Sequence, residues 1–334
     1  MRVRQRTAAL LEVLGVYLAG QLVTGQLIRL LGLRPVNPLA RLTVAVTDAE
    51  LLTATWQLFG LVTLQYVGWF LLIIPINYWH RRRGAAAYGL TRAGHSWTDL
   101  MAAGLATAAL CLWPTLAVDL VNAIHPVGET VPWRQALFDT SWRRWQFWLF
   151  TGVLSWGLVA VVEEIFFRGY CQRRLAEDWG DAAAIAGITC LFIFSHTQYL
   201  TFNAYNAAKL PTLLLVALGS GVVFAKTRSL VPSIVAHAIG NVPMTPFWQA
   251  AVVAALIVGT VVAARRGATV VRQVFSGATV IGCVGLGVIG TAYAIASARV
   301  EGLGFVAAAM VVLAIVLEAE DRGRQPADTD LAVG

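Results

Sequence analysis

Three short polar signatures interrupt otherwise apolar stretches of the chain. An ionisable side chain at the centre of a bilayer costs roughly 2.5–3.5 kcal/mol on insertion scales, so such residues call for a functional reason. Together the signatures supply carboxylates, imidazoles and an amide donor, which are the groups that water-mediated hydrolysis of an amide bond requires. They are Glu163-Glu164-x-x-x-Arg168, Phe192-x-x-x-His196 and His237-x-x-x-Asn241.

The first signature gives its two adjacent carboxylates different roles. Residues four apart in a helix share a face, so Glu164 can pair with Arg168. Glu163 lies about 100° further around the helix and lacks that partner, which makes it the candidate general base. The alternative is that both glutamates only neutralise arginines at the cytoplasmic interface. Those arginines are Arg168, Arg173 and Arg174.

The other two signatures contribute histidines. His196 closes an apolar run, and Phe192, one turn earlier, can hold the imidazole ring by packing. His237 and Asn241 share a helix face, where an imidazole and an amide could together stabilise an oxyanion. The alternative for His196 is an ordinary interfacial residue. The alternative for His237 and Asn241 is hydrogen bonding between helices that only holds the bundle together.

Transmembrane helices are the elements that must position these side chains. Of the 334 residues, 58% are hydrophobic and 13% are charged, whereas soluble domains average about 45–50% and about 25%. The composition predicts an integral membrane protein of the all-α class, a polytopic bundle of about 8–10 spans that each cross about 30 Å of hydrocarbon. The expected spans lie near 8–29, 51–77, 99–121, 146–167, 182–200, 208–226, 230–246, 247–264, 276–297 and 302–318.

Basic residues cluster at alternate ends of these spans. The positive-inside rule then predicts that both termini are cytoplasmic, in a protein of the cell (plasma) membrane. This topology accounts for the net charge of +7, so no nucleic-acid partner is expected, and the lipid bilayer is the predicted surrounding. The clusters assigned to the cytoplasmic side include Arg2, Arg4 and Arg6, Arg81, Arg82 and Arg83, Lys226 and Arg228, and Arg265 and Arg266.

The three signatures, in this order, resemble those of the CPBP family of intramembrane proteases. That family comprises CAAX proteases and bacteriocin-processing enzymes and is also called the Abi or Rce1-like family. The likeness covers roughly residues 85–246. Its residues are Glu163-Glu164-Ile165-Phe166-Phe167-Arg168-Gly169-Tyr170, then Gln172-Arg173-Arg174-Leu175, Phe192-x-x-x-His196, and Val231-Pro232-Ser233-Ile234-Val235-Ala236-His237-Ala238-Ile239-Gly240-Asn241.

The resemblance implies a bundle of about eight helices around a conical catalytic cavity that opens toward the cytoplasm. It implies that Glu163 and His196 activate a water molecule, while His237 and Asn241 form the oxyanion hole. It also implies a division of the chain into an N-terminal transmembrane hairpin, a CPBP-like protease core, an extra C-terminal pair of spans and a polar cytoplasmic tail. The supporting residues would be Glu164, Arg168 and Phe192. The four segments would be 1–84, 85–264, 265–318 and 319–334.

The expected function is therefore that of a glutamate-type intramembrane endopeptidase that needs no cofactor. The closest alternative is a zinc metalloprotease with Glu163, His196 and His237 as ligands, because one carboxylate and two histidines make a sound catalytic zinc set. Asn241 beside His237 favours the metal-free mechanism. A non-catalytic membrane immunity or scaffold protein is a second alternative. A proton-coupled transporter that uses the same residues as a relay is a third.

The substrate class expected from the resemblance is a peptide or a membrane-anchored protein. Prenylated C-terminal peptides are the eukaryotic theme of the family, but the sequence alone does not reveal a prenyl-binding groove. The cleavage site and the oligomeric state are likewise not readable from the residues.

Overall fold

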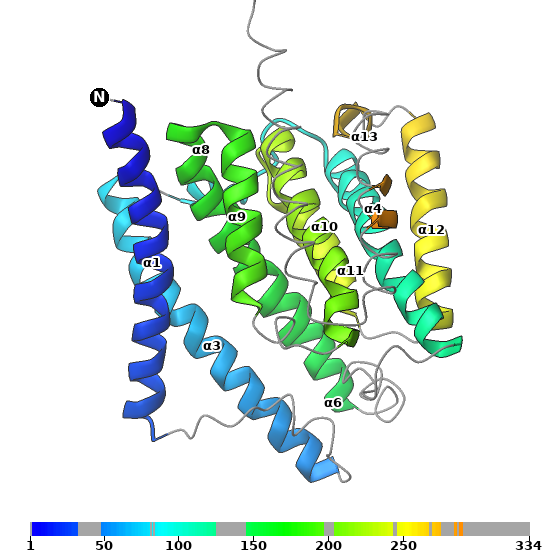
Figure 1. The fold of residues 1–334 in the computed structure, drawn as a ribbon, viewed down its shortest axis with the longest axis horizontal. Helices are drawn as coiled ribbons and strands as arrows, with labels where there is room; N and C mark the ends of the chain where they lie inside the picture. The colour runs from blue at the N-terminus through cyan, green and yellow to red at the C-terminus, as the bar shows by residue number, and fades with distance from the viewer. Residues whose placement is uncertain are drawn as a thin grey trace, which may run out of the picture.

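The computed structural model describes residues 2–32, 48–80, 82, 84–124, 145–196, 204–242, 246–266, 269–274, 284–285 and 287–289. Every regular element within these ranges is a helix, and the helices pack side by side in a bundle (Figure 1). The prediction of an all-α helix bundle is therefore confirmed for the described part of the chain.

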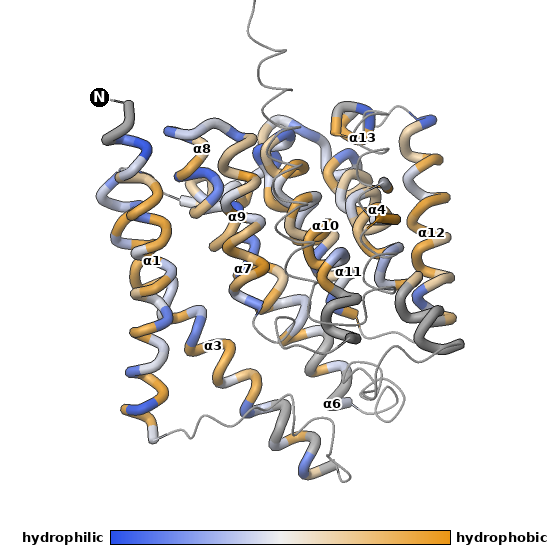
Figure 2. The backbone as a smooth tube through the Cα atoms, in the orientation of Figure 1, coloured by the Kyte–Doolittle hydropathy of each residue, from blue (hydrophilic) through white to orange (hydrophobic). Residues whose placement is uncertain are grey.

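Five helices in the described ranges are long and apolar enough to cross a membrane, with apolar stretches of 18 to 26 residues. About 20 helical residues suffice to cross a hydrocarbon core of roughly 30 Å. Figure 2 shows that α12, at one edge of the bundle, is hydrophobic along most of its length. The five helices are α1 (Arg2–Leu30), α3 (Asp48–Trp79), α4 (Trp97–Ile124), α10 (Ala204–Thr227) and α12 (Pro246–Arg265).

A sixth long helix carries the first polar signature and changes its hydrogen-bonding pattern along its length. Two of its segments, η2 and η3, are π-helical, and Glu163 and Glu164 end the short α-helical segment between them. Single π-helical turns within α-helices frequently mark functional sites. The consecutive segments are α6 (Trp145–Trp148), η2 (Leu149–Ala160), α7 (Val161–Glu164), η3 (Ile165–Gln172) and α8 (Arg173–Trp179). We refer to residues 145–179 as the signature helix.

A glycine turn folds the chain back from the signature helix. Gly180 has a φ of +83°, which glycine adopts without the steric cost that a side chain would bring. It connects α8 directly to α9 (Asp181–Ser195), and the two helices pack against each other. The end of α9 is thereby returned toward the middle of the signature helix.

Two helices are shorter than their predicted spans. The expected span 182–200 is the helix α9, which ends at Ser195, and the expected span 230–246 is α11 (Val231–Gly240). At about 1.5 Å per residue, α9 rises about 22 Å and α11 about 15 Å, so neither crosses roughly 30 Å alone. The prediction of full-length spans was wrong here. The physical consequence is that His196 and Asn241 lie at helix ends, as the C-caps of α9 and α11.

The helix α4 lies at the centre of one half of the bundle. It packs against α10, α11 and α12, and α13 (Thr269–Val274) covers its N-terminal half. In the other half, α1 and α3 pack as a pair against the signature helix, and η1 (Ala85–Tyr88) contacts η3. The predicted spans 276–297 and 302–318 and the tail 319–334 lie outside the described residues, apart from 284–285 and 287–289. The segment boundaries at 84, 264 and 318 stay predictions.

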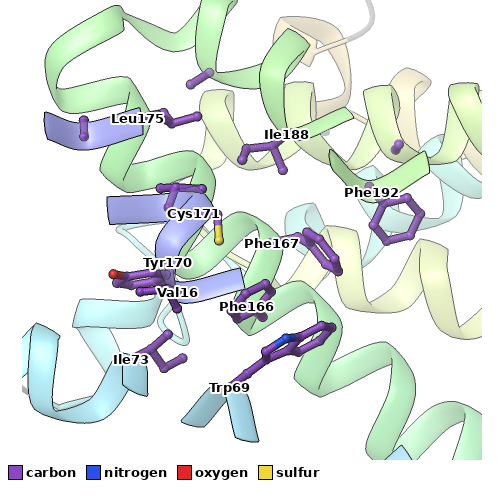
Figure 3. Close-up of a cluster of buried hydrophobic side chains, with 14 of the residues drawn as sticks. Val16, Trp69, Ile73, Phe166, Phe167, Tyr170, Cys171, Leu175, Ile188 and Phe192 are labelled. Atoms are coloured by element: carbon purple, nitrogen blue, oxygen red, sulfur yellow. The ribbon is translucent and has the colours of Figure 1, made fainter. Parts of the chain in front are cut away.

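An aromatic cluster joins α3, the signature helix and α9 (Figure 3). The Trp69 indole on α3 stacks on the Phe166 ring of η3, with ring centroids 4.1 Å apart. Phe167 meets Phe192 of α9 edge to face at 5.0 Å. Since all four side chains are almost completely buried, this cluster fixes α3, η3 and α9 relative to one another beside the polar signatures.

Candidate active site

Glu164 is the most deeply buried carboxylate of the signatures and makes contacts on two sides. Its Oε1 atom lies 3.1 Å from Nη1 of Arg168 and 2.8 Å from Nδ1 of His237. The ion pair expected from the four-residue spacing is therefore present, and His237 extends it to α11. Because the side chains of Glu164 and Arg168 are fully buried, the carboxylate and the guanidinium must compensate each other's charge.

Arg168 is held by two further contacts besides the ion pair. Its Nη2 atom donates to the carbonyl oxygen of Ala217 on α10 at 3.0 Å. Its Cζ atom lies 4.5 Å from the centroid of the Phe192 ring, a cation–π contact between two almost completely buried side chains. Arg168 thus ties the signature helix to α9 and α10 and fixes the orientation of Glu164.

Glu163 faces a different set of side chains. Its Oε1 atom accepts a hydrogen bond from the Tyr66 hydroxyl of α3 at 2.9 Å. Its Oε2 atom is buried and has no hydrogen-bond partner within the described residues. The Nε2 atoms of His196 and His237 lie 4.0 Å and 3.9 Å from this oxygen. The two histidines and the first glutamate, which lie far apart in the sequence, are therefore brought together around one carboxylate oxygen.

The ring of His196 is fixed by the end of α9. Its Nδ1 atom lies 2.7 Å from the carbonyl oxygen of Phe192, one turn earlier. The Phe192 ring packs against the imidazole with centroids 4.4 Å apart and also meets the His237 ring edge to face at 6.1 Å. Phe192 therefore contacts both imidazoles as well as Arg168.

The partners of the two Nδ1 atoms determine where the protons lie. A carbonyl oxygen only accepts hydrogen bonds, so Nδ1 of His196 must carry a hydrogen. The same holds for Nδ1 of His237 when the Glu164 carboxylate is ionised. In each neutral ring Nε2 then bears a lone pair. As long as both rings are neutral, a proton-donating group such as a water molecule is therefore needed between the two Nε2 atoms and Oε2 of Glu163.

Asn241 is placed by its contact with η2. Its Nδ2 atom donates to the carbonyl oxygen of Ser155 at 3.4 Å, a long hydrogen bond that links the end of α11 to the signature helix. In this arrangement the amide is engaged by the backbone. Its backbone N–H donates to the carbonyl oxygen of His237 at 3.0 Å, so Asn241 caps the end of the helix that carries His237.

Tyr66 is a site residue that the sequence did not reveal. It lies in the middle of α3, in the segment expected to be a hairpin outside the core, and its side chain is almost completely buried. The signal was weak, because one tyrosine in an apolar span is ordinary. A buried phenol nevertheless needs a hydrogen-bond partner within the membrane, and here the partner is 97 positions further along the chain.

The ligand set predicted for zinc fits a metal poorly. Two ligand atoms at about 2.0–2.1 Å from a tetrahedral Zn²⁺ lie roughly 3.4 Å apart. The distances from Oε2 of Glu163 to the two Nε2 atoms are longer, at 3.9 and 4.0 Å. Across the described ranges, no group of three or more histidine, cysteine, aspartate or glutamate residues is arranged to hold a metal ion.

A pocket of roughly 610 Å³ lies away from this cluster, between η1, the α8–α9 turn and the end of α10. Its charged lining residues include Arg173 and Glu177, and it contains none of the four predicted catalytic residues. This pocket is therefore not the catalytic cavity that the family resemblance implies. The cavity toward the cytoplasm stays a prediction.

One comparison with known proteins matches the region that contains Glu163, His196 and His237. No curated protein and no solved structure matches the chain. Residues 144–243 match the family model described as type II CAAX prenyl endopeptidase Rce1-like. This range covers the signature helix, α9, α10 and α11, and it includes all three polar signatures. The chain therefore carries an Rce1-like protease domain at residues 144–243.

Proposed function

We propose that the protein is an intramembrane endopeptidase of the glutamate type, in which Glu163 and His196 activate a water molecule. The observation that supports this most strongly is the buried Oε2 atom of Glu163, which lacks a hydrogen-bond partner among the described residues and lies about 4 Å from two imidazole nitrogens. The distance of 4.0 Å between Oε2 of Glu163 and Nε2 of His196 is too long for a direct hydrogen bond. It suits a water molecule that lies between these two atoms and donates one hydrogen bond to each.

In the proposed reaction the water oxygen attacks the carbonyl carbon of the peptide bond, and Glu163 takes one proton from the water. The other hydrogen of the water stays on its oxygen and donates a hydrogen bond to Nε2 of His196, which orients the attacking lone pair. When the tetrahedral intermediate collapses, the C–N bond breaks and Glu163 returns its proton to the leaving amine. The products are a carboxylic acid, which keeps the second water hydrogen, and an amine. The acid then passes that hydrogen to the amine through solvent, which gives a carboxylate and an ammonium, and the enzyme ends in its starting protonation state.

His237 acts in this scheme as an imidazolium whose Nε2–H donates to the developing oxyanion. The nearby charges support this state, because the fully buried Glu164 carboxylate lies 2.8 Å from Nδ1 of His237. Two buried carboxylates, Glu163 and Glu164, are then balanced by two cations, Arg168 and the His237 imidazolium. A neutral His237 would leave one negative charge uncompensated in a site of low dielectric.

Asn241 is the second proposed donor to the oxyanion. Its amide is engaged by the Ser155 carbonyl at 3.4 Å, so it can contribute only if that long bond gives way when substrate binds. Hydrogen bonds in free enzymes often tighten or exchange in this way on substrate binding. We therefore assign Asn241 a smaller share of transition-state stabilisation than His237.

The substrate class that we propose is a peptide bond near the membrane surface, in a prenylated peptide or a membrane-anchored protein, as the name of the matching family indicates. The proposed location is the plasma membrane with both termini in the cytoplasm. A zinc-dependent protease with Glu163, His196 and His237 as ligands is the alternative mechanism, and its ligand distances fit less well. A scaffold or immunity protein would have no use for the buried, unsatisfied oxygen of Glu163.

The experiment that tests the function is hydrolysis by the purified protein in detergent, with matched farnesylated and unmodified C-terminal peptides. Mass spectrometry locates the cut, and reaction in H₂¹⁸O shows whether one ¹⁸O atom enters the new carboxylate. We expect such incorporation, with cleavage that a metal chelator leaves intact. Loss of cleavage on chelation, restored by zinc, would replace the mechanism by the metal-dependent one. A lack of cleavage across both peptide sets, by protein that remains folded, would favour the scaffold alternative.

A further inference from the structure

Tyr66 provides a contact to Glu163 from outside the matched domain. Its hydroxyl lies 2.9 Å from Oε1 of Glu163, and its side chain is only 4% exposed. A phenol donates one hydrogen, so the bond engages one carboxylate oxygen and leaves the other facing the imidazoles. We propose that Tyr66 is a positioning residue that directs Oε2 of Glu163 toward the reacting water. This inference rests on the proposed role of Glu163 as general base.

The hydrogen bond makes the two oxygens of Glu163 inequivalent. A carboxylate on a glutamate side chain can otherwise rotate about its last bond and present either oxygen. Donation from Tyr66 opposes that rotation, since turning the group would break the 2.9 Å bond inside a buried site.

The position of Tyr66 is itself fixed by packing. Its ring lies 5.6 Å from that of Trp69, the residue that stacks on Phe166 three positions after Glu163 in the signature helix. Figure 3 shows Trp69 of α3 reaching this part of the signature helix. The hydroxyl is therefore carried by a segment that is clamped onto the same helix as the carboxylate.

A close helix crossing holds α3 from its other side. A Cβ atom added at Gly68 would lie 2.8 Å from the carbonyl oxygen of Gly20 on α1, so glycine is required for the approach of the two backbones. The α1–α3 pair thus braces Tyr66 between α1 and the signature helix. The expected N-terminal hairpin, residues 1–84, would then be part of the catalytic apparatus and not only a membrane anchor.

The test compares Tyr66→Phe with Tyr170→Phe. Both substitutions remove one buried hydroxyl that donates to a carboxylate, but Tyr170 donates to Glu12 on α1 at 3.0 Å, outside the site. A hydrogen bond to a charged group is worth roughly tenfold or more. For Tyr66→Phe we expect kcat to fall about tenfold with KM unchanged, whereas Tyr170→Phe should leave both close to their wild-type values.

The split between kcat and KM follows from the groups that face Glu163. These are Tyr66 from α3, His196 at the end of α9 and His237 from α11. The histidines remain in the Tyr66→Phe variant, and only the donor that holds Oε1 of Glu163 is lost. A fall in kcat at unchanged KM therefore reports the orientation of the carboxylate and not the binding of substrate.

The outcomes separate this inference from the proposed function. In Tyr170→Phe the value of kcat should stay close to that of wild type, whatever that substitution does to thermal stability. An unchanged kcat in Tyr66→Phe would overturn the positioning role, even if Glu163→Gln is inactive. Full activity of Glu163→Gln would instead overturn the proposed function. A thermal unfolding midpoint of Tyr66→Phe near that of wild type distinguishes a positioning effect from loss of folded protein.

Discussion

Nδ1 of His237 lies 2.8 Å from Oε1 of Glu164, and neither side chain is more than 6% exposed. The same oxygen also contacts Arg168, so one buried carboxylate orients both a guanidinium and an imidazole. Such a carboxylate can hold His237 as an imidazolium and aim its Nε2–H at a developing oxyanion. The four-residue spacing predicts Glu164 only as the partner of Arg168 in an ion pair. In the structure Glu164 also contacts His237, the proposed donor to the oxyanion, and so links the ion pair to the proposed reaction.

Replacement of Glu164 by Gln should slow the reaction. The carboxylate accepts a hydrogen bond from Nδ1 of His237 at 2.8 Å, and a neutral amide in its place holds the imidazole less strongly. Hydrogen bonds to charged groups are worth roughly tenfold or more, so we expect kcat to fall by about that factor. Values of kcat for purified wild type and Glu164→Gln, with thermal unfolding midpoints as a check on folding, test this expectation. An unchanged kcat would show that Glu164 does not act through His237.

Arg168 should contribute mainly to stability. Its removal leaves Glu164 without its guanidinium in a fully buried site, and breaking a buried pair in this way costs about 3–5 kcal/mol. We expect Arg168→Ala to lower the free energy of unfolding by that amount, measured by denaturation in detergent. The matched control is Arg228→Gln, which breaks the exposed pair with Asp181 and should cost about 0.2–1 kcal/mol. An equal loss of unfolding free energy in the two variants would contradict the proposed role of Arg168 in stabilising the fold.

The two proposed oxyanion donors, His237 and Asn241, should differ in how much each contributes to kcat. Loss of a donor that is aimed at the oxyanion reduces kcat by roughly 10²–10³-fold. We expect a loss of that size for His237→Ala, whose ring is fixed by Glu164. For Asn241→Ala we expect about tenfold, because the amide is engaged by the Ser155 carbonyl in the free protein. Single-turnover rates on one peptide substrate provide the comparison, and a larger loss for Asn241→Ala would reverse the assignment.

Much of this site could be predicted from spacing within single helices. The Glu164–Arg168 pair follows from four-residue periodicity, and Phe192 contacts His196 as expected for residues one turn apart. These relationships are local, so they hold regardless of how the helices are arranged in the bundle. The contact between Glu164 and His237 is of another kind, because it joins residues separated by 73 positions. Residue spacing predicts that the signature helix and α11 each have a polar face, but it does not predict that these two faces contact each other.

What could not be predicted comes from packing between distant segments. Tyr66 reaches Glu163 because α1 and the aromatic contact of Trp69 with Phe166 fix α3 against the signature helix. No local pattern around Tyr66 encodes that arrangement. Hydropathy also overestimated the length of α9 and α11, since a window average does not locate the helix ends at Ser195 and Gly240. Those early ends place His196 and Asn241 at helix termini.

The measurement that tests the central claim most directly is the single-turnover hydrolysis rate of Glu163→Gln against that of Glu177→Gln. Gln keeps the size of the side chain and a hydrogen-bond acceptor for Tyr66, but it cannot take a proton from water. A general base typically contributes roughly 10²–10⁴-fold, so we predict a loss of that size for Glu163→Gln. Glu177 lies on α8 of the same helix, in an exposed ion pair with Arg82, and its replacement should leave the rate close to that of wild type. A rate for Glu163→Gln within a few fold of wild type would contradict the account.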